Sequence, residues 1–372
     1  MKNKNARFTF LYAIGSILIV SGHCFNGGIN LAFDFFQPYY FHLALFTFVS
    51  GYFYKEENEN HVLSYIWKKI KKLIIPMYVI NFFFGLFVLI TKQFGFQLGS
   101  EFNLYNLIIS PITNGHQFVY NLCFWFVVPL FCIECFNVLL KKYTKKFSFL
   151  NEYVYFIIYL ILGILALWIS KNEIESGILI ALLRFLFFLP FYQLGTLYNK
   201  KIEKKDNMNN VLYFTILFMI QLIIFLSIKQ MPHFNPAWLK FEGYMILPYI
   251  EAILGIAFWV RVAKILENIT KDSKIINLIA DNAFAIMAYQ LIGFFVIKLL
   301  CEFGHNYTSY FVNFNPYAFR NDMWYFYIPR GVGQTLIVYL VAGIMIPIGI
   351  QKLINIGKEK AFSYYKNNKE TR

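Results

Sequence analysis

Charged residues are scarce in this sequence. Only 15% of its 372 residues are Asp, Glu, Lys or Arg, whereas 58% are hydrophobic and 21% are aromatic. Soluble globular domains carry about 25% charged residues, so this composition excludes a soluble protein and leaves no room for a sizeable soluble domain. The chain must lie mostly in lipid.

Cysteine is also scarce, and its placement argues against a disulfide framework. The five cysteines lie in or beside apolar runs, where a free thiol behaves as a small hydrophobic group. Cys132 and Cys135 form a C-x-x-C pair, but without a βαβ context we interpret them as packing residues. His23, His42 and Asp34 do not have the spacing typical of a metal site. We therefore expect no metal and no bound cofactor.

Long apolar runs separated by short polar breaks fill most of the chain. About 20 apolar residues are needed to cross a bilayer as an α-helix, and runs of roughly this length recur throughout. The sequence therefore predicts an all-α, polytopic transmembrane bundle of about ten spanning helices. The expected helices are residues 8–26, 39–54, 73–91, 120–140, 149–170, 177–198, 210–228, 245–262, 275–301 and 329–351.

Most of the 34 Lys and Arg residues fall in alternate connections and in the C-terminal tail. Cytoplasmic loops retain such residues, so both termini are expected in the cytoplasm, with a membrane domain at 1–355 and a basic cytoplasmic tail at 356–372. The net charge of +14 then reflects topology and contacts with anionic membrane lipid, and no nucleic-acid partner is expected. We expect a multi-pass protein of the inner (plasma) membrane, and leave a homo-oligomer open. The basic connections lie within residues 68–72, 141–146, 200–205 and 261–274.

Polar residues inside the apolar runs are informative because a charged side chain at the bilayer centre costs at least about 2.5–3.5 kcal/mol. Each is either satisfied by a neighbouring helix or functional. His23 and His42 stand out, because antiparallel packing of the first two helices places both near the outer face at one depth. Imidazole can take and return a proton at neutral pH. The full set is His23, His42, Glu134, Arg184, Glu251, Asp281, Gln290 and Lys298.

Three basic residues are candidates for contacts with phosphate groups: Lys69, Lys72 and Arg184. The alternative interpretation of the two lysines is the positive-inside rule. The alternative for Arg184 is an ion pair with Glu134. The sequence alone leaves both alternatives open.

Two connections on the outer side are longer than the others, at residues 92–119 and 302–328. The second mixes aromatic rings with Asn, Asp and Arg side chains. Such a surface would suit sugar rings, which stack on aromatic groups and take hydrogen bonds through their hydroxyls. It would equally suit an aromatic belt at the lipid headgroups.

Several motifs resemble, in order and spacing, those of acyltransferase family 3, integral membrane enzymes that O-acylate sugars of bacterial surface polysaccharides. The most specific part is the opening pair of helices, with a histidine at the end of the first and a histidine-led second helix. The likeness spans nearly the whole chain. The matching segments are residues 19–23 (IVSGH), 41–46 (FHLALF), 48–53 (FVSGYF), 68–76 (KKIKKLIIP), 125–131 (WFVVPLF), 189–195 (LPFYQLG) and 282–290 (NAFAIMAYQ).

The resemblance implies that His23 is the essential general base, while His42 polarises the donor or holds the tautomer of His23. Many members carry a cation within the first helix, where this sequence has Tyr12, so that role would fall to Arg7 or Arg184 or be absent. The expected donor-binding residues are Arg7, Lys69, Lys72 and Arg184.

Gln290 stands where many members of the family carry a late histidine. An amide can orient a substrate but cannot exchange a proton, so the expected role of Gln290 is binding. The expected acceptor-binding residues are Trp125, Gln290, Arg320, Asp322 and Trp324.

The expected reaction is transfer of an acyl group, most simply acetyl from acetyl-CoA, to a sugar hydroxyl. The acceptor would be a cell-surface polysaccharide or its lipid-linked precursor, presented from outside. A transporter or flippase for a lipid-linked saccharide is the alternative, although such proteins often show internal repeats or broken helices. A non-catalytic subunit of a polysaccharide assembly complex is a further alternative, and it would release no CoA.

Overall fold

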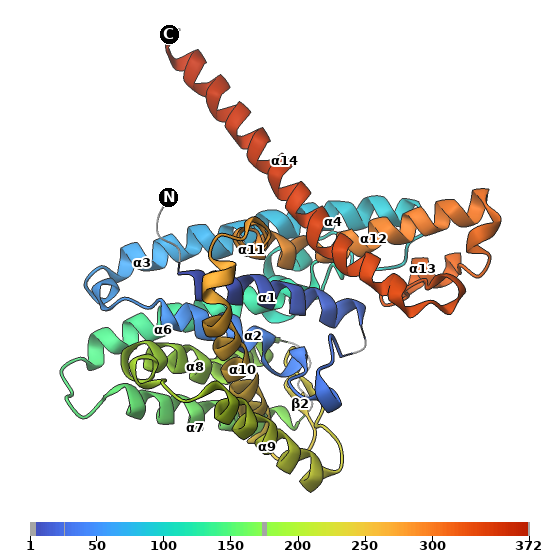
Figure 1. Cartoon of the computed structure of the whole chain (residues 1–372). Helices are drawn as coiled ribbons and strands as arrows, with labels where there is room; N and C mark the ends of the chain where they lie inside the picture. The colour runs from blue at the N-terminus through green and yellow to red at the C-terminus, as the bar shows by residue number, and fades with distance from the viewer. Residues whose placement is uncertain (1–4, 26, 173–176, 371–372) are drawn as a thin grey trace.

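The computed structural model describes residues 5–25, 27–172 and 177–370 as a bundle of α-helices with one two-stranded hairpin (Figure 1). Lys2, Lys4, Arg372 and the last residue of the expected first helix lie outside the described residues. The helices of the first half are α1 (Ala6–Cys24), α2 (Pro38–Tyr52), α3 (Val62–Lys69), α4 (Ile75–Gln93), α5 (Ser110–Thr113), α6 (Val127–Thr144) and α7 (Glu152–Ser170). The second half contains α8 (Gly177–Leu197), α9 (Asn210–Ile228), β1 (Phe234–Asn235), β2 (Lys240–Phe241), α10 (Leu247–Thr270), α11 (Lys274–Asp281), α12 (Ala283–Tyr307), α13 (Pro316–Asn321) and α14 (Leu336–Glu370).

Eight helices within the described residues are long and apolar enough to cross a membrane. The two other expected spans are present as α2 and α10. α2 has only 15 residues, and α10 carries Glu251, Arg261 and Lys264 among its apolar residues. The all-α, multi-pass architecture predicted from the sequence is therefore confirmed.

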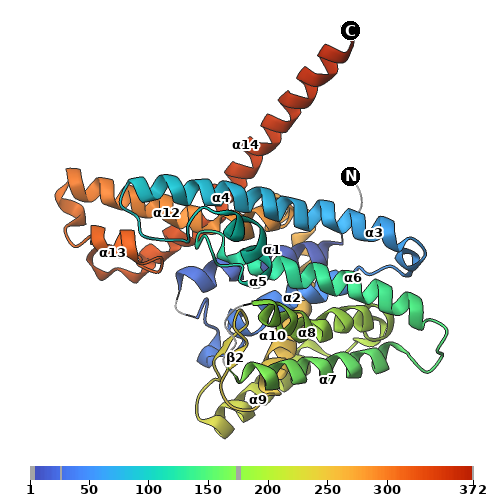
Figure 2. The same ribbon diagram turned by 180° about the vertical axis from the view of Figure 1, so that it is seen from behind.

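The lysine-rich connections lie together at one end of the bundle, on the left of Figure 1, and we call this the inner end. The beginning of α1 and the end of α14 lie on the same side. The outer end holds α13 and the C-terminal end of α12. The view from behind in Figure 2 shows the same separation, with α13 at one end and the loop before α3 at the other.

Helix boundaries depart from expectation at several places, three of which have a clear local cause or consequence. The expected helix 73–91 begins earlier, because α3 continues through a π-helical turn (Ile70–Ile74) into α4. The expected helix 275–301 is two helices, because Asn282 leaves the helical conformation (φ −107°, ψ 14°) and its side chain donates to the Leu278 carbonyl at 2.8 Å. The last helix begins at Leu336 rather than 329 and continues to Glu370, so the expected tail is helical.

The apolar core has two parts, with α1 between them. One part is built mainly on α2, α7, α8, α9 and α10, and the other mainly on α4, α12 and α14. α1 contributes Leu11 and Ile19 to the first part and Val20 and Cys24 to the second. Residues near the end of α1 therefore lie at the seam between the two parts.

Glycine lets α2 and α8 approach closely in the first part of the core. A Cβ at Gly51 would lie 1.8 Å from the Tyr192 carbonyl oxygen, and one at Gly195 would lie 1.9 Å from the Phe48 carbonyl oxygen. Small residues at helix interfaces permit such backbone contact in membrane proteins. This packing holds α2, and with it His42, beside α8.

Candidate active site

His23 is held by a hydrogen bond from α12. Its Nδ1 lies 3.0 Å from Oε1 of the buried Gln290. The Gln290 Nε2 donates to Cys123 Sγ at 3.1 Å and to the Met287 carbonyl at 3.4 Å. Because that carbonyl only accepts hydrogen bonds, the amide nitrogen faces it and Oε1 faces His23. Nδ1 therefore carries the proton, and Nε2 of the neutral ring is left as a base; we call His23, Gln290 and Cys123 the histidine group.

His42 lies close to His23, as expected, but the two rings do not touch directly. Tyr39 stands edge-on to both, with ring centroids 6.4 Å from His23 and 5.6 Å from His42. The His42 Nδ1 lies 2.5 Å from the Pro38 carbonyl and donates to it. Gln290 rather than His42 contacts the His23 Nδ1 and holds its tautomer, which corrects one of the two expected roles of His42. The other expected role, polarising the thioester, stays a prediction.

Trp324 covers His23 from the outer end. The indole stacks on the imidazole with ring centroids 5.8 Å apart and planes inclined by 21°, and Trp324 itself is 49% exposed. Asp322 accepts a hydrogen bond from the Trp324 main-chain N–H at 2.8 Å. The buried ammonium of Lys298 donates to the Met323 carbonyl at 2.7 Å. These two contacts hold the segment that carries Trp324 over His23.

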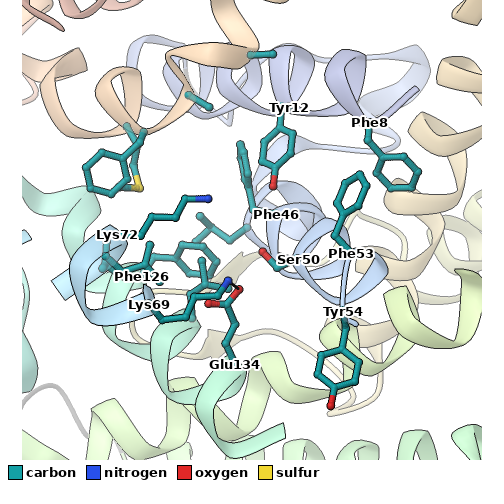
Figure 3. Close-up of a pocket in the computed structure, with 18 of the residues that line it drawn as sticks. Phe8, Tyr12, Phe46, Ser50, Phe53, Tyr54, Lys69, Lys72, Phe126 and Glu134 are labelled. Atoms are coloured by element: carbon teal, nitrogen blue, oxygen red, sulfur yellow. Dashed lines mark hydrogen bonds and ion pairs between the residues drawn. The ribbon is translucent and has the colours of Figure 1, made fainter. Parts of the chain in front are cut away.

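A cavity of about 710 Å³ approaches His23 from the inner end. It is lined by residues of α1, α2, α6, α11 and α12 and of the π-helical junction between α3 and α4. In Figure 3, Lys72 points into the open space toward Tyr12 and Phe46, while Lys69 lies against Glu134. The Lys69 Nζ is 2.5 Å from Glu134 Oε1, whereas Lys72 forms no ion pair within the described residues. Lys72 is therefore the cation that an incoming anionic group meets.

The deep end of this cavity lies about one helical turn from the histidine group. Ile19 on α1, Met287 on α12 and Val127 on α6 all line it. Each stands three or four residues to the inner side of a member of the histidine group, about 5 Å at 1.5 Å per residue. Asn5 also lines the cavity, so along α1 it extends about 21 Å from Asn5 to Ile19.

Arg7 does not line the cavity, contrary to its expected donor-binding role. Its Nη1 lies 2.8 Å from Glu203 Oε1, and its Nε lies 2.8 Å from Glu267 Oε2. Two carboxylates thus compensate one guanidinium. Arg7 ties the start of α1 to the segment that follows α8 and to the last turn of α10.

Arg184 is likewise placed differently from expectation. It is 1% exposed, and it donates through Nε to the Ala237 carbonyl at 2.7 Å and through Nη1 to the Asn114 carbonyl at 2.9 Å. Both partners belong to outer connections, so Arg184 lies away from Lys69 and Lys72. The alternative ion pair with Glu134 is also wrong, because Glu134 pairs with Lys69.

Trp125 packs in a cluster around Arg184 and is 5% exposed. The Arg184 guanidinium lies 4.7 Å from the Trp125 ring and 5.3 Å from the Trp238 ring. His116 stacks on Trp238 with centroids 4.8 Å apart. Burial and the nearby Arg184 charge lower the pKa of His116 to about 4, which keeps this ring neutral. Trp125 is thus a packing residue, and its expected contact with an acceptor does not fit this position.

The remaining expected acceptor residues gather at the outer end, but only some approach His23. Trp324 contacts it directly, Asp322 positions Trp324, and Gln290 holds the ring from within. Arg320 is farther out, where it pairs with Glu302. Gln290 is fully buried, so it positions His23 rather than binding a substrate.

A family model described as an acyltransferase domain, of the acyltransferase 3 family, matches residues 5–348. The chain belongs to acyltransferase family 3. No curated protein and no solved structure matches it. The matched residues include the histidine group, the residues that line the cavity at the inner end, and the outer segment after α12 that carries Trp324. All of these parts therefore belong to the acyltransferase domain.

Some residues of this acyltransferase site were missed by the sequence reasoning. The sequence did not identify Cys123 as a site residue, because a cysteine beside an apolar run is usually a packing residue. Tyr39, three residues before His42, lies on the same face of a helix, and this spacing could have identified it. Burial of the Lys298 charge in lipid was recognised as costly. Its partner is a main-chain carbonyl, that of Met323, which no sequence pattern predicts.

Proposed function

We propose that this acyltransferase moves an acyl group, most simply acetyl from acetyl-CoA, to a sugar hydroxyl of a cell-surface polysaccharide or its lipid-linked precursor. One observation carries the proposal. A long cavity with a basic inner end stops about one turn short of a histidine whose Nδ1 is hydrogen-bonded to Gln290. Such an arrangement suits a donor with anionic groups at one end and a reactive thioester at the other.

The donor would enter from the inner end. Its phosphates would meet Lys72, with Lys69 close by but already compensated by Glu134. The narrow arm of the donor would pass beside Phe46 and Tyr12, whose rings pack on each other with centroids 5.8 Å apart and face the cavity (Figure 3). Lys72 thus supplies a cation opposite Tyr12, the position at which many family members carry one.

The chemical step would use His23 as a general base. Nε2 takes the proton of the acceptor hydroxyl while the hydroxyl oxygen attacks the thioester carbonyl carbon. The tetrahedral intermediate then collapses, the C–S bond breaks, and the imidazolium returns the proton to the leaving thiolate to give CoA. The Nδ1 proton stays on the ring and donates to the Gln290 oxygen throughout, so the imidazolium is stabilised as it forms.

The acceptor would approach from the outer end, in the plasma membrane of the cell. Trp324 lies between His23 and the outside, and its half-exposed ring offers a face on which a sugar can stack. The sugar hydroxyl must pass beside this ring to reach Nε2. Donor and acceptor would thus meet at His23 from opposite ends of the bundle.

The test is the variant His23→Ala, assayed with purified protein, acetyl-CoA and de-O-acylated surface polysaccharide. CoA release and glycan acylation should fall by about 100- to 10,000-fold, the usual contribution of a general base. His305→Ala is the matched control, because His305 lies in the last turn of α12 with its Nδ1 2.8 Å from the Phe311 carbonyl, away from His23. Unchanged acylation by the His23 variant at normal protein level would refute the assignment.

A further inference from the structure

A second cavity, of about 590 Å³, lies at the outer end of the bundle. It is open to the outside and is bordered by the residues after α4, the last turns of α12, and α13. Its volume falls within the range of about 300–1,000 Å³ that is typical of small-molecule sites. Figure 1 shows these three elements together at the end opposite to the lysine-rich connections.

The walls of this outer cavity are held in place by Arg320. The guanidinium pairs with Glu302 and donates to the Phe94 carbonyl at 3.4 Å and the Pro316 carbonyl at 3.2 Å. The Arg320 carbonyl in turn accepts from the Gln97 main-chain N–H at 3.0 Å. Segments from three parts of the chain are thereby joined before any ligand binds.

The groups left free in the outer cavity are polar and uncharged. The side-chain amides of Gln97 and Asn306 make no hydrogen bond within the described residues, and each offers both donors and an acceptor. The only charges lining it, Glu302 and Arg320, compensate each other. Tyr317 adds an aromatic ring that is 77% exposed. A neutral ligand rich in hydroxyls, with a face that stacks on a ring, fits these groups better than a phosphate or a lipid chain.

The outer cavity is too far from His23 to hold the group that is acylated. Glu302 follows Gln290 by twelve residues on α12, about 18 Å at 1.5 Å per residue. Trp324 follows α13 directly and stacks on His23. A chain of sugars seated beside Tyr317 would therefore cross Trp324 before reaching the base.

We infer that the outer cavity is a distal saccharide subsite, which binds a unit of the acceptor glycan several sugars away from the one that is acylated. The inference rests on the proposed function and deepens it. The acceptor is then a glycan chain rather than a single sugar, and transfer improves with chain length until the chain reaches Tyr317. The subsite adds affinity without taking part in the chemical step.

The experiment uses the de-O-acylated surface polysaccharide of the source cell, partially hydrolysed and separated by size. Wild-type kcat/KM should be higher for long fragments than for the shortest ones. Tyr317→Ala and Gln97→Ala should each reduce that ratio by about two- to tenfold, as expected for loss of about 0.5–1.5 kcal/mol of ring stacking or hydrogen bonding. Tyr310→Ala is the matched control, because Tyr310 is 70% exposed on the same outer segment but does not line the cavity.

Binding of a long fluorescent fragment to the His23→Ala protein provides a second measurement that needs no turnover. It should weaken with Tyr317→Ala and stay unchanged with Tyr310→Ala. Equal length dependence in the wild type and the Tyr317 variant, or equal effects of the two tyrosines as in an aromatic belt, would overturn the subsite. Absence of acylation at every length would instead refute the proposed function, and the binding measurement would still decide on the subsite.

Discussion

The approaches to His23 from the inner and the outer end of the bundle differ, because one is an open cavity and the other is covered by a side chain. On the inner side, a cavity of about 710 Å³ exists in the structure and ends about one helical turn short of the histidine group. On the outer side, Trp324 lies directly on the imidazole. Lys72, which forms no ion pair within the described residues, lines the inner approach. The uncharged indole of Trp324 covers the outer approach.

This difference bears on how two unlike substrates can meet inside a membrane. The inner path suits a flexible donor that enters a preformed space by one charged end. The outer path suits an acceptor that must first be recognised, because its hydroxyl reaches Nε2 only beside Trp324. A covered base is also shielded from outside water, which would otherwise compete with the sugar for the thioester.

The largest effect is expected at Gln290, which both approaches share. Gln290→Met keeps the size of the side chain but removes the acceptor for the His23 Nδ1 proton. Loss of a buried hydrogen bond worth about 1–3 kcal/mol should lower kcat by about 10- to 100-fold with little change in KM. Gln290→Glu restores an acceptor and should recover part of the rate. Equal losses in both variants would indicate a packing role.

A smaller effect is expected on the outer side from Lys298→Met, which removes the donor to the Met323 carbonyl. The segment carrying Trp324 should loosen, so that diethyl pyrocarbonate modifies His23 from outside about tenfold faster, the equivalent of about 1.4 kcal/mol. Mass spectrometry of His23 in right-side-out vesicles measures this rate. Lys298→Arg keeps an N–H donor and should stay near the wild type. An unchanged rate in the Met variant would mean that Lys298 does not hold the cover.

The smallest effect is expected on the inner side from Lys72→Met. Removing one partly exposed charge should raise KM for acetyl-CoA about two- to fivefold, leave kcat unchanged and weaken the dependence of KM on salt. Lys71→Met is the control, because the Lys71 amine lies 5.1 Å from the Trp67 ring and does not line the cavity. The same change in both variants would assign the effect to general surface charge.

The fold was largely predictable because lipid imposes simple demands on sequence. Apolar length identified the spans, since a chain in hydrocarbon must satisfy its backbone within helices. The orientation drawn from lysine placement stays a prediction. The break at Asn282 and the early start at Val62 were missed. Asn282 does not change the apolar content of its segment, whereas the lysines at 68–72 made the start of the helix at Val62 resemble a basic connection.

The site was predictable only in part. His23 and His42 were found close together, and Lys69 and Lys72 were placed at the inner cavity, because antiparallel neighbours and topology constrain depth. Arg7 and Arg184 were assigned to the donor, but their partners come from distant segments: Glu203 and Glu267 in one case, and outer main-chain carbonyls in the other. No local pattern carries such information.

The sequence by itself determined that this chain is a multi-pass helical acyltransferase with a histidine near the end of its first helix, since apolar length, charge placement and motif order are properties of neighbouring residues. Only the tertiary structure decided which groups surround that histidine. Gln290 and Trp324 reach His23 because α12 and the outer segment pack beside α1. Packing between helices therefore determines the depth at which His23 lies and the end of the bundle that its Nε2 faces.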